Sequence, residues 1–480
     1  MLQYKDKTIL SEIKAFFTTS EKAIFSILDL LNHFRLSEKQ LKIVSAPNNQ
    51  VSNLSILYLL ILFPFFGIKD NYSYAETGLY QIYNKGKDIF YRFMSNPQIN
   101  WRDISYSINK QLLSKVSKAT DNKDITPTCL IIDDTDIHKT GKKMELIGKI
   151  YSHVSQKMLL GFKGLFMGYY DGKSFFALDF SLHGEKGKNK KRLYGLKPKE
   201  LKQRFSKKRE KTSPGYMREQ EYHLPKTKRA IEMIRTAIKK GIRFDYVLVD
   251  SWFTSFELVK FIKTRRIKTH FLGMIKMGKT RYLLNNQLLT AKEIKEVLRK
   301  TKKQKRSKLL SVYYSEVVVD FKGIQVKLFF FKTSKRGKWH GLLSTDLELT
   351  YEKAYKIYAT RWTIEVFFKE SKQHLYLEGG QFRDFDSQIA NISIRMMQYN
   401  ILSTIKRMSN YETVGQLFRE IEKEKTNLTM VEKIWKLICE ILLKIASILE
   451  VEAELIMTKI LSDNQHIAKI INFEHLKIVA

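Results

Sequence analysis

Residues 126–278 alternate between strand and helix patterns, and no other feature of the chain restricts its fold as strongly. Three strand patterns come first: TCLIIDDTD, KMLLGFKGLFMGYY and SFFALDFSLHG, the last two joined by the turn sequence Tyr-Asp-Gly-Lys at 170–173. A helix pattern ended by Gly241, the buried strand FDYVLVD and the helix SFELVKFIKTRR follow. This alternation predicts an α/β core with a partly parallel sheet.

The regions around this core show other patterns. Residues 1–105 have helical periodicity and few strand signals, and residues 401–480 are helical again, so we expect a helical region at each end. Residues 279–344 are rich in lysine and in β-forming residues, and they predict two or three strands inserted between the two parts of the core, 106–278 and 345–400. The predicted fold class is therefore α/β with a β-rich insertion and helical flanks.

Positive charge dominates the composition. The chain of 480 residues has 85 Lys and Arg against 49 Asp and Glu, a formal net charge of +36, which predicts a polyanionic partner and nucleic acid first of all. Residues 186–211 alone hold 13 basic and two acidic residues, the pattern of a loop that contacts DNA or RNA, or of a solvated loop. Cys129 and Cys439 have no companions at metal-ligand spacing, so neither a disulfide framework nor a structural zinc site is indicated.

No segment predicts a membrane protein. The most apolar run, LSILYLLILFPFFGI at residues 54–68, is shorter than the roughly 20 residues that a membrane helix needs, and Pro64 interrupts it. The N-terminal sequence MLQYKDKTIL lacks the pattern of a signal peptide. We therefore expect a buried helix at residues 54–68, no membrane partner and a cytoplasmic protein.

The stretch YATRWTIEVFFKESKQ, residues 358–373, places charged groups beside apolar ones. If it forms a single helix, Tyr358, Arg361, Glu365 and Lys372 fall within about 60° of one another, next to a row of apolar side chains. A charged row in this position borders buried surface. The simpler interpretation is a solvated face held by salt bridges.

Two strand patterns end in carboxylates. LIIDDTD ends in Asp133 and Asp134, and YVLVDSWFTS contains Asp250 directly after its apolar run. Carboxylates at the ends of buried strands lie where an α/β sheet forms a crevice, although a single Asp there often only caps a turn or helix. Together with Glu365 they supply the few anionic oxygen ligands that a Mg²⁺ pair needs, with open positions for phosphate and water.

These acids and the spacing of the charged row resemble a known family. Two residues separate Tyr358 from Arg361, three separate Arg361 from Glu365, and six separate Glu365 from Lys372. This spacing matches the Y-R-E-K signature of the insertion-sequence-4 family of bacterial DDE transposases. Asp134, Asp250 and Glu365 occupy the positions of the Asp-Asp-Glu triad of that family. The resemblance covers roughly residues 125–400.

The resemblance implies a ribonuclease-H-like catalytic core and cut-and-paste transposition. Water attacks at the transposon end and frees a 3′ hydroxyl, which then attacks in turn, often through a DNA hairpin. Asp134, Asp250 and Glu365 would bind two Mg²⁺ ions, for which Mn²⁺ can substitute. The implied partner is double-stranded DNA, both the inverted-repeat ends and the target, bound by a dimer in the bacterial cytoplasm or nucleoid. The helical flanks match the family only in general character; we expect residues 1–105 to bind DNA ends and residues 401–480 to mediate oligomerisation.

The other signature residues have implied roles at the DNA. Arg361 and Lys372 would hold phosphates, and Tyr358 would donate to a phosphate or stack on a base or sugar. Hairpin formation in this family involves an aromatic residue that holds a flipped base. We assign this base-stacking role to Trp339, with Trp252 and Trp362 as alternatives.

Two questions stay open in the sequence. The first ligand is assigned to Asp134, which alternation places on the side of Ile132, but Asp133 and Asp136 are alternatives. The function is assigned to a transposase, but a domesticated DNA-binding protein without turnover and another metal-dependent nuclease on the same fold are alternatives.

Overall fold

The computed structural model describes residues 8–15, 22–36, 52–77, 79–80, 86–118, 126–264, 268–332, 334 and 336–448. Contacts within the chain divide it into two compact units. The helical unit consists of Met1–Ala119, Phe205–Tyr216 and Glu370–Ala480. The sheet unit consists of Thr120–Arg204 and Met217–Lys369.

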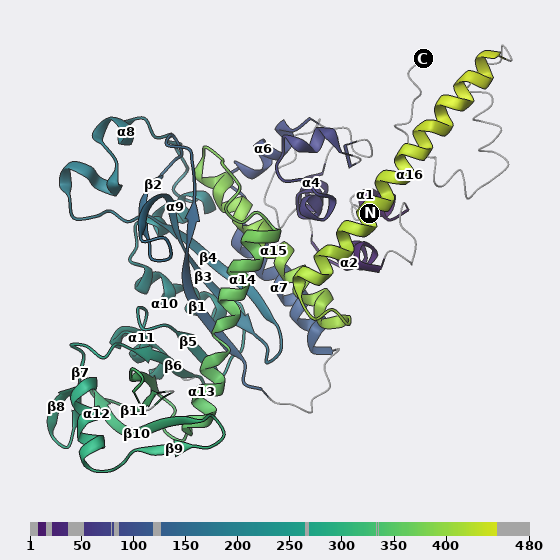
Figure 1. Ribbon diagram of the computed structural model, residues 1–480. Helices are drawn as coiled ribbons and strands as arrows, with labels where there is room; N and C mark the ends of the chain where they lie inside the picture. The colour runs from purple at the N-terminus through teal and green to yellow at the C-terminus, as the bar shows by residue number, and fades with distance from the viewer. Residues whose placement is uncertain are drawn as a thin grey trace. The chain divides into compact units, whose positions relative to one another are not determined.

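The core of the sheet unit is a mixed sheet built on one long strand, β1 (Figure 1). Antiparallel strands extend it on one side and parallel strands on the other. The antiparallel part comprises β1 (Cys129–His138), β2 (Gly148–Ser152), β3 (Lys157–Tyr170) and β4 (Phe175–His183), and the parallel part adds β5 (Tyr246–Val249) and β6 (His270–Ile275). The partly parallel α/β core predicted from the sequence is confirmed, whereas β2 was missed.

The β3–β4 connection follows the predicted turn chemistry. The Asp171 carboxylate accepts hydrogen bonds from the backbone N–H groups of Lys173 and Ser174, at 2.9 and 2.6 Å. Gly172 has a φ of +100°, a conformation that only glycine adopts without strain. A short polar residue followed by glycine therefore fixes the hairpin and the register of both strands.

Helices cover the two faces of the sheet (Figure 1). They are α9 (Pro214–Tyr222), α10 (Lys226–Lys239), α11 (Phe256–Lys263), α13 (Tyr351–Ala359) and α14 (Trp362–His374). Helix α10 buries Ala230, Met233, Ile234 and Ala237, a stripe with the spacing of one helical face. From α14, Phe367 and Phe368 pack their rings against Phe166 of β3.

The insertion continues the same sheet. Its elements are β7 (Arg281–Leu284), β8 (Gln287–Thr290), α12 (Ala291–Lys300), β9 (Lys305–Ser307), β10 (Val312–Phe321), β11 (Ile324–Lys332) and β12 (His340–Ser344). Strand β12 pairs antiparallel with β6, which gives one sheet of 12 strands. The prediction of two or three inserted strands was too low, because β7, β8 and β9 have three or four residues each and lack a long apolar run. The fold class is α/β, with a β-rich insertion and helices at both ends, as predicted.

The single helix assumed for residues 358–373 is wrong. Thr360 and Arg361 separate α13 from α14. The Thr360 hydroxyl donates to the Ile357 carbonyl at 2.7 Å, and the backbone N–H groups of Thr360 and Arg361 bond three residues back instead of four. Hydroxyl groups that compete for backbone carbonyls tighten the chain into such a turn. Arg361 therefore lies between two helices, where its side chain can face a neighbouring strand.

The helical unit is organised around α15. Its helices are α1 (Thr8–Ala15), α2 (Lys22–Asn32), α4 (Asn53–Leu62), α6 (Asp88–Met94), α7 (Trp101–Lys118), α15 (Phe385–Met408) and α16 (Val414–Ile448), with the 3-10 turns η1 (Phe63–Phe66) and η2 (Ser73–Glu76). Helix α15 is buried from Phe385 to Ile405. Some of its buried polar groups are bonded to other helices: Asn400 donates to Asn109 at 2.6 Å and Gln398 to the Leu60 carbonyl at 2.9 Å.

The apolar run at residues 54–68 forms α4 and η1, and its helix is buried as predicted. Within the described ranges, no helix is long and apolar enough to cross a membrane.

The basic segment 186–211 is partly structured, with η3 (Lys190–Gly195) and α8 (Pro198–Lys202). Its last residues belong to the helical unit, where Arg209 Nε donates to both carboxylate oxygens of Asp386 at 3.0 and 3.1 Å. The Arg209 side chain is 0% exposed. Arg209 thus holds this segment in place, and its charge is used inside the protein.

A buried histidine makes the sheet unit sensitive to acid. Burial and the nearby Lys226 lower the pKa of His183 to about 4, although Glu221 opposes them. Because the unfolded chain binds a proton near pH 6.5 and the folded chain does not, stability is full above pH 6.5 and falls between pH 6.5 and 4. We expect wild type to lose about 2 kcal/mol more than His183→Gln between pH 7 and pH 5. Urea unfolding at both pH values measures this difference.

The exposed His223 provides the control, because His223→Gln should keep the wild-type pH dependence. Equal acid sensitivity of wild type and His183→Gln would contradict the assignment.

Candidate active site

Arg361 joins two carboxylates from distant parts of the chain. Its guanidinium donates to Asp133 Oδ2 at 2.7 Å and to Glu365 Oε1 at 2.6 Å. Asp133 lies on β1 and Glu365 in the first turn of α14, so the arginine ties the glutamate helix to the central strand. All three side chains are partly buried, with 17% (Arg361), 15% (Asp133) and 31% (Glu365) exposed, so water screens these ion pairs less than fully exposed pairs.

Asp250 directly follows β5, beside this group. The last paired residues of the parallel β1–β5 ladder are Ile132 and Val249, so Asp133 and Asp250 come at the next position of each strand. Asp250 Oδ1 accepts hydrogen bonds from the backbone N–H groups of Trp252 and Phe253, at 2.9 and 3.2 Å. The turn after β5 therefore fixes the Asp250 carboxylate at the end of the sheet.

Tyr358 supports the same strand end. Its hydroxyl donates to the Val249 carbonyl at 3.3 Å, one residue before Asp250. Burial raises the pKa of Tyr358 to about 12, and Asp250 and Asp133 raise it further while Arg361 lowers it. The hydroxyl is therefore protonated at neutral pH and acts as a donor.

Asp134 faces a different partner. Successive side chains of a strand point to opposite faces, and Asp134 forms an ion pair with Lys226, at the start of α10. The Lys226 ammonium also lies 4.2 Å from the ring centroid of Trp252, two residues after Asp250. This cation–π contact places Asp134 near the Asp250 turn.

The four carboxylates differ in how many oxygens the protein engages. Asp133 accepts hydrogen bonds with both oxygens, from the Asp134 N–H at 2.8 Å and from Arg361. In the described part of the chain, Asp134, Asp250 and Glu365 each have only one oxygen bonded to a protein donor. These three carboxylates, and not Asp133, keep an oxygen for another ligand.

Burial and charge shape the protonation of this group. Burial raises the pKa of Asp133 to about 7; Arg361 lowers it and Asp250 raises it. Burial acts to lower the pKa of Arg361, but Tyr358, Asp133 and Glu365 outweigh it, so that the pKa is raised. Arg361 is thus a permanent cation among carboxylates that repel one another.

The chemistry of these groups fits a divalent metal ion, but their positions do not yet form a complete site. Carboxylate oxygens are the ligands that Mg²⁺ prefers, and Asp134, Asp250 and Glu365 each have one oxygen to give. However, no three His, Cys, Asp or Glu side chains of the described residues lie close enough to hold one ion. Lys226 and Arg361 supply the positive charge here, so metal binding requires these contacts to rearrange.

The remaining predicted residues have other contact partners. Trp339 lies in the insertion, half-buried, with the ammonium groups of Lys332 and Lys295 at 5.0 and 5.9 Å from its ring centroid. Lys372 belongs to the helical unit, where it forms an ion pair with Glu378 at 2.7 Å.

The structure also defines the contacts of Asp136, the alternative first ligand, and the exposure of Trp252 and Trp362, the alternative stacking residues. Asp136 forms an ion pair with Lys163, its cross-strand neighbour. Trp252 and Trp362 are exposed, 46% and 63%, and flank Asp250 and Arg361 in sequence.

Lys226 was not found from the sequence. It stands in a lysine-rich helix, KTKRAIEMIRTAIK, where nothing distinguishes it from its neighbours. Only the packing of α10 on the sheet places its ammonium at Asp134.

Two family models match the chain and overlap in sequence. Residues 79–277 match the family described as DDE superfamily endonuclease, and residues 215–401 match the family described as Transposase DDE domain. The matches support a transposase of the DDE superfamily. The two ranges together contain every predicted site residue. No curated protein matches the chain.

Two solved structures are similar at low identity. One is the piggyBac transposase synaptic complex with hairpin DNA, determined by cryo-electron microscopy: 14% identity, 88% of this chain and 80% of that chain covered, TM-score 0.41. The other is the crystal structure of the NurA nuclease from Sulfolobus solfataricus: 11% identity, 54% of this chain and 81% of that chain covered, TM-score 0.24.

Proposed function

We propose that this protein is a cut-and-paste DNA transposase of the insertion-sequence-4 family that hydrolyses and rejoins phosphodiester bonds at one metal-dependent site. The supporting observation is that Asp134, Asp250 and Glu365, the residues that resemble the family triad, each keep one carboxylate oxygen that no described protein group occupies. A site that binds metal needs such oxygens, because hard cations take carboxylate oxygens as ligands.

The proposed cofactor is a pair of Mg²⁺ ions, with Mn²⁺ as a substitute. Asp134, Asp250 and Glu365 would hold them, and Lys226 and Arg361 would release their present contacts as the metal charge replaces theirs. When bound, such ions activate an attacking oxygen and stabilise the leaving one. The choice of Asp134 over Asp133 follows from the two engaged oxygens of Asp133.

The chain's own residues orient this site. Asp133 holds Arg361, and Arg361 holds Glu365, so the glutamate reaches the sheet in a fixed position. Tyr358 fixes the strand end before Asp250. When the carboxylates coordinate metal ions, the planar guanidinium of Arg361 can bind the phosphate group of the reacting phosphodiester. The Tyr358 hydroxyl can bind the same phosphate.

The reaction proposed is displacement at phosphorus, repeated. Water attacks the phosphodiester at a transposon end, the P–O bond to the leaving strand breaks, and a 3′ hydroxyl is released. That hydroxyl then attacks a second phosphodiester, on the opposite strand or in the target DNA. Both steps have the same geometry and charge, so one site can perform both.

The proposed partner is double-stranded DNA, bound by a dimer. The net charge of +36 supports a large phosphate-contacting surface. Residues 1–105 would recognise the transposon ends, and residues 401–480 would mediate oligomerisation. For base stacking we retain Trp339, with the exposed Trp252 and Trp362 as alternatives.

Lys372→Ala is expected to weaken binding to transposon-end DNA and to reduce the slope of log K against log salt by about one. The reason is that the ammonium would exchange Glu378 for a DNA phosphate. Fluorescence anisotropy over a salt series measures the slope. Glu378→Gln is the matched control: it leaves the lysine charge in place and should keep the slope. An unchanged slope for Lys372→Ala would exclude the phosphate contact.

The products of the reaction separate the proposed function from its alternatives. A transposase breaks and rejoins DNA at defined ends, whereas a nuclease on this fold breaks it without joining. A domesticated binding protein does neither and shows only salt-sensitive affinity. Incubation with Mg²⁺ and DNA that carries the sequences flanking its gene tests all three.

A further inference from the structure

The helical unit contains a pocket that the proposed catalytic site does not use. Its volume is about 560 Å³, within the range of small-molecule sites. The chain segments that line it are residues 60–72, residues 91–95 in and after α6, and residues 379–395, which lead into α15. All of them belong to the helical unit.

A buried arginine without a counter-ion lines this pocket. Arg395 is 6% exposed, and its guanidinium donates to Gln398 Oε1 at 3.1 Å. Its Nε has no hydrogen-bond partner, and among the described residues no carboxylate lies within ion-pair distance of it. Burial lowers the pKa of Arg395 to about 10, so it remains a cation. A buried unpaired charge is costly, and an anion in the pocket would compensate it.

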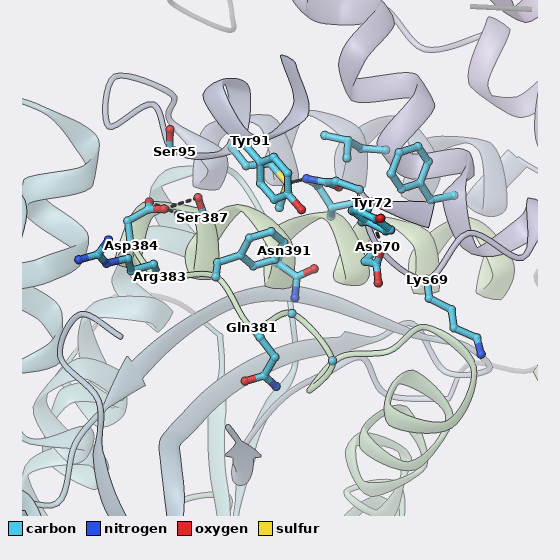
Figure 2. A pocket seen from close by; sticks show the side chains of 18 of the residues that line it. Lys69, Asp70, Tyr72, Tyr91, Ser95, Gln381, Arg383, Asp384, Ser387 and Asn391 are labelled. Carbon is cyan, nitrogen blue, oxygen red and sulfur yellow. Dashed lines mark hydrogen bonds between the residues drawn. The ribbon is translucent and has the colours of Figure 1, made fainter. Parts of the chain in front are cut away.

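A second unused donor lies one helical turn away. Asn391 is 2% exposed, and its Nδ2 has no partner. Residues four apart lie on the same helix face, so Asn391 and Arg395 present adjacent donors to one ligand. Figure 2 shows the Asn391 side chain pointing from α15 toward the segment of Gln381.

The two acids of the pocket accept hydrogen bonds from the protein, Asp70 with one carboxylate oxygen and Asp384 with both. Asp70 accepts hydrogen bonds from the N–H groups of Tyr72 and Ser73, both at 2.9 Å. Asp384 accepts from the N–H and the hydroxyl of Ser387, at 2.8 and 2.7 Å (Figure 2). Both carboxylates serve as local caps, and the basic residues at the rim outnumber them: Lys69, Arg92 and Arg383.

Aromatic rings line the same space. Tyr91 and Tyr72 are 37% and 63% exposed, and Tyr91 meets the ring of Phe382 edge-on at 6.3 Å. Exposed tyrosines beside phosphate-binding groups provide stacking surfaces for a base. The Lys87 ammonium lies 4.3 Å from the Tyr72 ring centroid and covers one of its faces. Unused cationic donors next to exposed aromatic rings suit a ligand with a phosphate at one end and a planar ring at the other.

We propose that this pocket binds one nucleotide, with its phosphate on Arg395 and Asn391 and its base against Tyr72 or Tyr91. The nucleotide is either free or an unpaired residue of a DNA strand, and only the second case rests on the proposed function. The site residues of the sheet unit take no part, so loss of this binding and loss of cleavage are separate results.

The test compares three ligands on the full-length protein by calorimetry: dAMP, inorganic phosphate and a short single-stranded oligodeoxynucleotide. Arg395→Met is expected to weaken the binding of dAMP or of the oligonucleotide roughly 10- to 100-fold. Arg407→Met, an equal charge change on the same helix, should leave it unchanged. Asn391→Leu should weaken it as well, which covers the case that Arg395→Met does not fold.

The ligand whose affinity depends on Arg395 shows whether the pocket binds a free nucleotide or an unpaired residue of a DNA strand. Dependence of dAMP binding indicates a free nucleotide, and dependence of the oligonucleotide alone indicates an unpaired DNA residue. If neither depends on Arg395 and Asn391, the proposal is wrong. Inorganic phosphate that binds as tightly as dAMP would overturn the assignment of a base. Without ligand, Arg395→Met should melt no lower than wild type, whereas a purely structural arginine predicts a lower melting temperature.

Discussion

Glu365→Gln is expected to lower the rate of DNA cleavage about a thousandfold, because it removes one of the three carboxylates that we propose as metal ligands, and such a metal site stabilises the transition state by several kcal/mol. The amide keeps the size of the side chain, so α14 should stay in place. Affinity for DNA should change by no more than about threefold, since the basic surface remains. Single-turnover cleavage on denaturing gels and anisotropy measure the two quantities.

The matched control for this change is Glu257→Gln, an exposed acid in the first turn of α11 of the same unit. It should leave both quantities at wild-type values. If Glu365→Gln reduced affinity as strongly as cleavage, Glu365 would be a structural residue and not a metal ligand.

Asp134→Asn should also lower cleavage about a thousandfold, whereas Asp133→Asn should lower it only about tenfold to a hundredfold. The reason for the difference is the hydrogen bonding of the two carboxylates. Asp133 has both oxygens engaged and acts by holding Arg361, while Asp134 keeps one oxygen for metal. The same single-turnover assay ranks the two variants.

The opposite ranking would assign the first ligand to Asp133. Asp136→Asn completes the series. Because Asp136 pairs with Lys163, it should have the smallest effect on the chemical step. A thousandfold loss in that variant would contradict the choice of Asp134.

Much of the fold could be predicted from local sequence. Apolar runs followed by Asp133, Asp134 and Asp250 indicated the strands β1 and β5, and these strands are neighbours in the sheet. The expected end of the first strand at Asp133 and Asp134 is wrong, because β1 continues to His138 through its pairing with β3. The Asp-Gly turn at residues 171–172 indicated the β3–β4 hairpin. In both cases the signal is carried by a few consecutive residues whose backbone preferences agree with the final structure.

Other features depend on contacts that no local pattern contains. The helix breaks at Thr360 because its hydroxyl competes with the helix for a backbone carbonyl. The free-energy difference between helix and turn is small there, and the periodicity of apolar residues does not reveal it. The contact of Lys226 with Asp134 depends on how α10 packs against the sheet. The pocket of the helical unit requires segments about 300 residues apart in sequence, around Tyr91 and Arg395, to come together.

The most direct test of the central claim is to incubate the protein with Mg²⁺ and linear DNA that carries the sequences flanking its own gene, and to follow both strands on a denaturing gel. The account predicts cleavage at defined ends with new 3′ hydroxyls, followed by hairpinned or joined products, all absent with Glu365→Gln. DNA that is bound but never cut, or cut without any joined product, would contradict the assignment of a transposase.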